Sequence, residues 1–336
     1  MENISMFDSS ITFNNTSRKL CYQTEKVHNH ITQFTNVSSG IIYSLAFLLG
    51  TTSNGFVLWI KVTRMEKTYR SILFQHFLIS GFIYSLFLPL DIVYFASGNH
   101  WPFGSFMCRV NSFIFYLNMF LSAFILTLFS IDYCIVIVFP FRYNSHRRPH
   151  LATKEVILIW ILAVYVSVSY FVFKNTYDCH GTTKCLNSFD YDELNGLSHT
   201  GKIQYQAIVI FAFIEGFVLP FLIILSCFIV TALLYHRKKS SKYTTSLKLI
   251  FSKQILFAIC WFPYHVFSFL KLTSFITGVS HIDEVAEISL PITMSLTTIN
   301  IWVNPLLYAF ICPDFKKVFS IQSIFSKNIS HQRGTI

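Results

Sequence analysis

Residues 110–131, with the sequence VNSFIFYLNMFLSAFILTLFSI, contain no charged side chain. A helix needs about 20 mostly apolar residues to cross the hydrocarbon core of a bilayer, and this stretch is long enough. Residues 288–312 form a second uncharged stretch near the other end of the chain. These two stretches predict that the chain crosses a membrane more than once.

The composition of the whole chain agrees with a membrane protein. Of the 336 residues, 53% are apolar and only 12% are charged, whereas a soluble domain carries about 25% charged residues. A soluble chain of this size would need more charge to cover its surface. The composition therefore argues against a soluble enzyme, a disordered chain and a small disulfide-framework protein.

The apolar stretches predict an all-α membrane protein: a seven-transmembrane helix bundle with a short amphipathic eighth helix. The second and fifth spans are weaker than the others because Asp91 and Glu215 interrupt them. Six or eight spans are the alternatives to seven. We expect the seven helices near residues 39–61, 70–97, 105–138, 155–174, 203–235, 247–271 and 286–311.

The distribution of Lys and Arg predicts which side of the membrane each connection faces, because cytosolic loops are enriched in both. If the first, third and fifth connections and the C-terminal tail are cytosolic, they hold 18 of the 26 basic residues and four of the 16 acidic ones. The N-terminus is then extracellular, in a multi-pass protein of the plasma membrane. The net charge of +10 reflects loops that face anionic lipid, so no nucleic-acid partner is needed to explain it.

The chain divides into three expected parts: a glycosylated extracellular segment at 1–38, the helix bundle at 39–312, and an amphipathic helix with a cytosolic tail at 313–336. The first forty residues lack the apolar core of a signal peptide, so the first span has to start translocation itself. Sequons for N-glycosylation precede the first span and agree with an extracellular N-terminus. They begin at Asn3, Asn14, Asn15 and Asn36.

Cysteines on the predicted extracellular side suggest a tether. A bond from Cys108, at the top of the third span, to the loop between spans four and five would hold that loop over the mouth of the bundle. Cys179 and Cys185 both qualify as the partner, and the spacing does not choose between them. Cys312, after the seventh span, is either a palmitoylation site or a buried thiol.

Short motifs occur in a fixed order along the spans. They are Asn54 in the first span, Trp160 in the fourth, Pro220 in the fifth, Cys260-Trp261-Phe262-Pro263 in the sixth, Asn304-Pro305-Leu306-Leu307-Tyr308 in the seventh, and Asp314-Phe315-Lys316-Lys317 after it. With these motifs the chain resembles the rhodopsin-like (class A) G-protein-coupled receptors over nearly its whole length. A similarity to the chemoattractant branch, with its formyl-peptide, anaphylatoxin, chemerin and orphan receptors, is carried by 100–104 (HWPFG), Pro140, 144–147 (NSHR) and 216–221 (GFVLPF).

The resemblance implies a cell-surface receptor for a chemoattractant-type peptide or lipid, with an inhibitory-class heterotrimeric G protein and arrestin as cytosolic partners. The sequence contains no H-E-x-x-H, C-x-x-C, P-loop or G-x-S-x-G motif, so we expect no enzymatic activity, no cofactor and no metal site. The resemblance favours Cys185 as the partner of Cys108, which leaves Cys21 and Cys179 either bonded to each other or free. A transporter is the more remote alternative; it predicts inverted repeats, and the sequence shows none.

The resemblance also implies a set of activation-switch residues. Prolines inside helices remove a backbone hydrogen bond and can act as pivots, and buried polar groups beside them have to find partners. Static packing between helices is the alternative interpretation of the same residues. The set comprises Asp132, Tyr133, Trp261, Pro263, Asn304, Pro305 and Tyr308.

Three positions depart from the family pattern. The family places an arginine where Tyr133 follows Asp132, a tyrosine at the position of Phe228, and a sodium-binding aspartate at that of Gly81. We therefore expect no sodium site. Three hypotheses remain: a receptor with weak or altered coupling, a decoy or scavenger with impaired G-protein coupling, and a lineage that has lost its use.

The ligand cavity is expected between the outer halves of spans two, three, five, six and seven. Asp91 and Glu215 are its distinctive members, because a carboxylate inside a membrane is costly and marks a functional site by default. A buried neutral carboxyl group is the alternative. Two carboxylates favour a cationic ligand or a basic peptide. The residues expected to point inward are Asp91, Tyr94, Tyr116, Glu215, Trp261, Tyr264, His265 and Met294.

Overall fold

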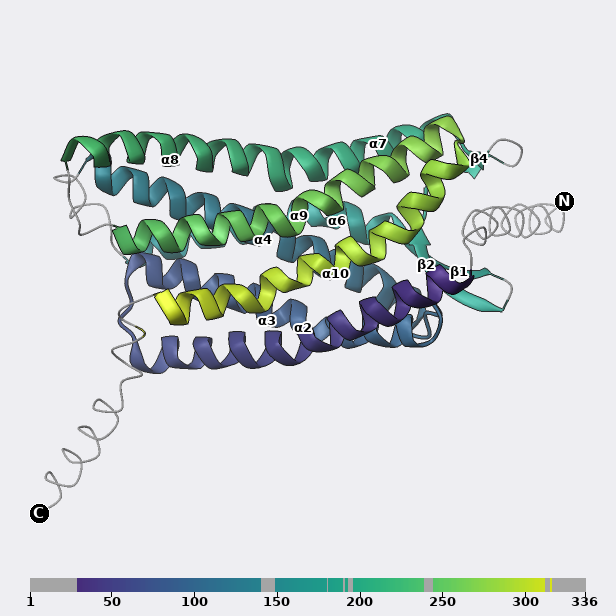
Figure 1. Cartoon of the computed structure of the whole chain (residues 1–336), viewed down its shortest axis with the longest axis horizontal. Helices are drawn as coiled ribbons and strands as arrows, with labels where there is room; N and C mark the ends of the chain where they lie inside the picture. Colours follow the sequence, from purple (N-terminus) through teal and green to yellow (C-terminus); the bar gives the residue numbers. More distant parts are fainter. Residues whose placement is uncertain are drawn as a thin grey trace, which may run out of the picture.

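The described part of the chain folds into a bundle with seven membrane-length apolar spans, as predicted (Figure 1). The computed structural model describes residues 29–139, 149–179, 181–189, 191–192, 196–238, 244–311 and 315. Six spans are single helices, and the fifth is composed of two helices joined by a π-helical turn, η1. The elements are α2 (Asn29–Arg64), α3 (Tyr69–Ala96), α4 (Gly104–Val138), α6 (Pro149–Val172), α7 (His199–Phe213), η1 (Ile214–Val218), α8 (Leu219–Lys238), α9 (Thr244–Thr277) and α10 (Ser280–Ile311).

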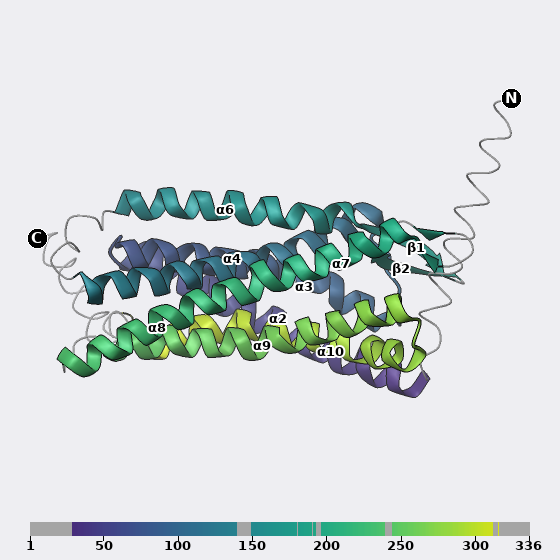
Figure 2. The same ribbon diagram turned by 90° about the horizontal axis from the view of Figure 1, so that it is seen from above.

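The core of the bundle is built around α4, which is the most buried of the seven spans. Met119, Phe120 and Leu121 of this helix are fully buried. Figure 2 shows α6 along one outer edge, where it packs against α3 and α4. Large apolar side chains such as Trp59 and Tyr165 stay exposed on the outer faces, as expected for a surface that contacts lipid.

The first span begins earlier than predicted. The helix α2 starts at Asn29 rather than near residue 39, so the expected boundary at residue 38 falls inside a helix. Asn36 is half-buried in α2, while Asn3, Asn14 and Asn15 lie outside the described residues. The predicted eighth helix also lies outside them, apart from Phe315, which is buried against Tyr308. Cys312 is outside them as well.

A π-helical turn interrupts the fifth span immediately before Pro220. Proline has no N–H and its ring clashes with the carbonyl four residues earlier, which here belongs to Gly216. The wider turn at Ile214–Val218 relieves this clash at the price of one extra residue per turn. A Cβ at Gly216 would lie 2.7 Å from Cε of Met119, so the glycine allows η1 to approach α4 closely.

Strands that the sequence analysis did not predict form at one end of the bundle. The strands β1 (Lys174–Cys179) and β2 (Thr182–Asn187) pair as an antiparallel hairpin, and β3 (Tyr191–Asp192) pairs with β4 (Gly196–Leu197). The hairpin lies at the end where α2 begins (Figure 1). We call this end of the molecule the hairpin end, and the end where α10 finishes the opposite end.

A disulfide joins the hairpin to α4, and a backbone hydrogen bond joins it to the segment just before α4. Cys108 is bonded to Cys185, which confirms the predicted pairing; Cys179 is also disulfide-bonded, and Cys21 lies outside the described residues. The Trp101 backbone N–H donates to the carbonyl oxygen of Thr183 at 2.7 Å. The HWPFG stretch thus serves to hold the hairpin across the bundle.

We predict that Cys108→Ser and Cys185→Ser reduce stability equally and that the double variant is no worse than either one, because each removes the same bond. Loss of a native disulfide costs about 2–5 kcal/mol. Surface expression and the thermal unfolding midpoint in detergent measure the effect. Cys227→Ser is the control, since Cys227 is a free thiol. A double variant clearly less stable than both single variants would contradict the shared bond.

Candidate functional site

A cavity of about 350 Å³ opens at the hairpin end. Residues from α2, α3, α4, α6, α7, α9 and α10 form its walls, and residues 184–187 of the hairpin cover it. Six of the predicted residues line it: Asp91, Tyr94, Tyr116, Tyr264, His265 and Met294. The spacing of these residues along the spans therefore predicted part of this wall.

Two predicted residues do not line the cavity among the residues that the structure describes. Glu215 lies within η1, where the extra residue of the π-helical turn changes the register; Gly216 is the buried residue there. Trp261 is fully buried beneath the cavity instead of in its wall. The prediction was wrong for Glu215 because a regular helix was assumed across the fifth span.

Aromatic residues form the floor of the cavity. The hydroxyls of Tyr116 and Tyr264 share a hydrogen bond at 2.5 Å, and the Tyr116 ring stacks on Tyr170 with centroids 3.3 Å apart. Below them, Trp261 contacts Phe115 at 5.4 Å and Tyr264 at 5.9 Å between ring centroids. A displacement of Tyr264 would therefore affect Trp261, which lies two residues before Pro263.

The charges around the cavity are mixed. Asp91 accepts a hydrogen bond from Nδ2 of Asn111 at 2.8 Å. Lys174, at the start of the hairpin, lies close enough to interact electrostatically with Asp91; burial lowers the pKa of Lys174 to about 8, while Asp91 opposes this shift. Lys184 and Glu287 line the cavity as well. The expectation of an acidic pocket was wrong, because Glu215 is elsewhere and two lysines are present.

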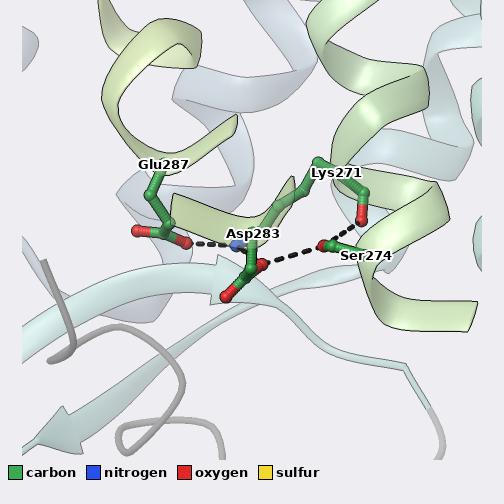
Figure 3. A network of polar contacts seen from close by, with 4 residues as sticks. All are labelled: Lys271, Ser274, Asp283 and Glu287. Atoms are coloured by element: carbon green, nitrogen blue, oxygen red, sulfur yellow. Dashed lines mark hydrogen bonds and ion pairs between the residues drawn. The ribbon is translucent and has the colours of Figure 1, made fainter. Parts of the chain in front are cut away.

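A network of ion pairs joins α9 to α10 at the hairpin end (Figure 3). The ammonium group of Lys271 lies between two carboxylates: it contacts Asp283 at 2.8 Å and also pairs with Glu287. Ser274 donates to Oδ1 of Asp283 at 2.9 Å. Because Glu287 also lines the cavity, the network fixes the wall that α10 contributes.

His265 is another polar residue of the wall. It is 2% exposed, and its Nε2 atom has no hydrogen-bond partner within the described part of the chain. The rings of Phe213, Phe217 and Tyr264 surround it at 5.4–5.5 Å. His265 of α9 is thus packed among aromatic rings at the contact between α9 and the fifth span.

Two buried asparagines make hydrogen bonds in the middle of the bundle, one between helices and one within α10. Nδ2 of Asn54 donates to the carbonyl oxygen of Ile301 at 3.1 Å, joining α2 to α10, and Nδ2 of Asn304 donates to Asn300 at 2.6 Å. A Cβ at Gly81 would lie 3.0 Å from Oδ1 of Asn54. A side chain at Gly81 would therefore push against this asparagine.

A lysine is enclosed by aromatic rings in the half of the bundle nearer the opposite end. Lys253 of α9 is 4% exposed, and its Nζ lies 4.0 Å from the ring centroid of Phe74 and 5.5 Å from that of Tyr308. The rings of Phe77 and Phe129 complete the enclosure at 5.4 and 5.8 Å. Charge counting assigned Lys253 to a cytosolic connection; cation–π contacts allow it to lie inside the bundle instead.

Asp132 and Tyr133 meet an arginine from a different helix. Nε of Arg70, in the first turn of α3, lies 2.9 Å from Oδ2 of Asp132, and its guanidinium group lies over the Tyr133 ring at 4.9 Å. Phe228, the other departure on this side, stacks on Phe251 with centroids 4.7 Å apart. The sequence offered no signal for the Arg70 contact, because the residues are far apart in the chain.

Comparison with known proteins agrees with this architecture. Residues 53–308 match the model of the seven-transmembrane receptor (rhodopsin) family. The chain is 32% identical to Chemerin-like receptor 1 of Homo sapiens, over 86% of this chain and 78% of that protein. It is 34% identical to Chemerin-like receptor 2 of Mus musculus, over 86% and 80%. It is also 34% identical to Probable G-protein coupled receptor 33 of Mus musculus, over 87% and 86%.

We predict that Lys271→Met destabilises the protein, because it leaves Asp283 and Glu287 together without the ammonium group between them. Removing one partner of a buried pair costs about 3–5 kcal/mol, and the partial exposure of both carboxylates reduces this cost. The thermal unfolding midpoint should fall by about 3 °C or more. Lys271→Met/Glu287→Gln should recover part of the loss; an unchanged midpoint in the single variant would contradict the network.

Proposed function

Because the chain belongs to the rhodopsin family of seven-transmembrane receptors, we propose that it senses a chemoattractant-type peptide or lipid and couples to an inhibitory-class G protein. The chain is a multi-pass cell-surface receptor and not an enzyme. To this family membership the proposal adds the class of ligand and the class of G protein. Arrestin is the second cytosolic partner that we propose.

The observation that carries this proposal is the cavity and its floor. A cavity of about 350 Å³ is large enough for part of a small ligand or the end of a peptide. Its floor, Tyr116 and Tyr264, is in contact with Trp261 through Tyr264. Ligand binding can thus change the packing around Pro263, at a point where α9 lacks one backbone hydrogen bond.

The mixed charges of the cavity support a peptide more than a lipid. A peptide end can offer a carboxylate to Lys174 and a donor to Asp91, whereas a fatty acid offers only a carboxylate. Several of the relatives are named as chemerin-like receptors. Chemerin is therefore the first ligand that we propose to test.

The topology that goes with this function places the hairpin end outside the cell. In the proposed division, 1–38 is an extracellular segment glycosylated at Asn3, Asn14, Asn15 and Asn36, 39–312 is the bundle, and 313–336 is the amphipathic helix and tail. Excess Lys and Arg in the other connections supports this orientation.

The proposed switch runs from the cavity floor to the cytosolic end. Trp261 and Pro263 form its upper part. Asn304, Pro305 and Tyr308 form its middle, where Tyr308 stacks on Phe74 at 3.8 Å. Asp132 and Tyr133 form its cytosolic end. The transporter alternative receives no support from the described helices, since a family of receptors accounts for them.

We predict that the protein activates inhibitory-class G protein when cells are exposed to chemerin, or to a panel of other chemotactic peptides and lipids. Asp91→Asn should raise the half-maximal concentration at least about tenfold, which corresponds to about 1.4 kcal/mol, because it removes a carboxylate from the cavity wall. Glu215→Gln is the matched control: it removes a carboxylate from the fifth span outside the cavity, and its response should be unchanged. Equal effects of the two variants would contradict this placement of the ligand.

The same experiment tests the decoy hypothesis. Uptake of labelled ligand without G-protein activation in the wild type, together with activation in Tyr133→Arg, would overturn the proposed coupling. We expect the opposite: the wild type signals, and Tyr133→Arg gives no gain. The two variants are compared at matched surface expression, with arrestin recruitment read in parallel.

A further inference from the structure

The carboxylate of Asp132 lies at the cytosolic end of α4 with only 7% of its side chain exposed. A carboxylate so far from water needs a cation or several hydrogen bonds to remain charged. The next residue along α4, Tyr133, is 2% exposed and carries no positive charge. Arg70 of α3 supplies the positive charge, through the contact between its Nε and Oδ2 of Asp132 at 2.9 Å.

The first turn of α3 holds Arg70 in place. The side chain of Thr68 caps this helix by accepting a hydrogen bond from the backbone N–H of Ser71. Tyr69 donates a hydrogen bond to the carboxylate of Glu155 in α6. Consecutive residues thus connect α3 to two neighbouring helices, and Arg70 is the one directed to α4. A cation in the first turn of a helix interacts unfavourably with the helix dipole. The arginine at position 70 is therefore favoured by its contact with Asp132 and not by its place in the helix.

Tyr133 provides a surface for the same arginine. The guanidinium carbon of Arg70 lies 4.9 Å from the centroid of the Tyr133 ring. Guanidinium groups bind favourably to the faces of aromatic rings, and more so away from water. An arginine at position 133 would instead place a second cation beside Arg70. The tyrosine therefore suits the presence of an arginine at position 70.

One nitrogen atom of the Arg70 guanidinium group does not donate a hydrogen bond to any described residue. This atom, Nη2, is buried and has no hydrogen-bond partner among the residues that the structure describes, while 29% of the Arg70 side chain is exposed. A buried donor without an acceptor is costly. Any rearrangement that brings a carbonyl or carboxylate oxygen to Nη2 is favoured for this reason.

We propose that Arg70 takes over, from α3, the place of the arginine missing after Asp132, and that its guanidinium group contacts the cytosolic signalling protein. Asp132 and Tyr133 orient the arginine in the unoccupied receptor. Nη2 is buried in that state, so the arginine has to turn outward on coupling for an acceptor of the G protein to reach Nη2. This inference rests on the proposed function, because it assigns the residue through which the receptor couples.

The test moves the arginine from one helix to the other. Purified wild type, Arg70→Gln, Tyr133→Arg and Arg70→Gln/Tyr133→Arg are reconstituted in nanodiscs with an inhibitory-class heterotrimer, and nucleotide exchange is measured with and without chemerin. Arg70→Gln should lower the exchange rate about tenfold, the effect of losing one charge-assisted hydrogen bond. Arg70→Gln/Tyr133→Arg should regain most of it, because a guanidinium group beside Asp132 can again reach the G protein. Tyr133→Arg alone should give no gain.

Lys67→Gln is the matched control, since Lys67 is an exposed cation shortly before α3; its exchange rate should equal that of the wild type. The proposal is overturned if Arg70→Gln catalyses nucleotide exchange on the G protein as fast as the wild type does. It is also overturned if the arginine at position 133 fails to rescue Arg70→Gln while Tyr133→Arg alone is active. A purely structural role of Arg70 would make the exchange rate follow the unfolding midpoint from variant to variant, whereas contact with the G protein lets the exchange rate recover without the midpoint.

Thermal unfolding separates this inference from the proposed function. Arg70→Gln and Asp132→Asn should each lower the unfolding midpoint, and the double variant should be no lower than the single variants, because both remove one pair. If neither the wild type nor any variant catalyses nucleotide exchange on the G protein, the proposed coupling fails. The contact with the G protein then fails too, and strict additivity of the two midpoint shifts would overturn the pairing as well.

Discussion

An ionised side chain inside the hydrocarbon of a bilayer is costly, and the arrangement of this bundle follows from where its charges find partners. Arg70 and Asp132 join α3 to α4. Lys271 joins α9 to α10 through Asp283 and Glu287. Lys253 joins α9 to the rings of α3, α4 and α10. Each charge thus fixes the position of one helix against another.

Two of these contacts involve α9, one on each side of Pro263. Lys271 lies toward the hairpin end, and Lys253 lies toward the opposite end of the same helix. Trp261, beside the proline, touches the cavity floor through Tyr264. A change at the floor therefore acts on a helix that is anchored at two points and is free of one backbone hydrogen bond between them.

Much of this fold follows from local sequence. Apolar length predicts the seven spans, and the motif spacing places Asp91, Tyr116 and Tyr264 at one cavity. The sequence was misleading at Glu215, because periodicity assumes a regular helix and the π-helical turn before Pro220 changes the register. The hairpin was missed because its strands are stabilised by the disulfide at Cys185 and by contacts with α4, which no local pattern encodes.

Pairs of residues distant in the chain are the part that sequence cannot supply. In the sequence alone, Tyr133 stands where the family motif has an arginine, so Asp132 has lost the cation that usually follows it. In the folded chain the cation is present, on Arg70, and the tyrosine ring binds its face. The cation that a carboxylate needs has to lie near it in space, and it can come from a residue far away in the sequence. A departure from a family motif is therefore evidence of lost coupling only after the surrounding helices have been searched for the missing group.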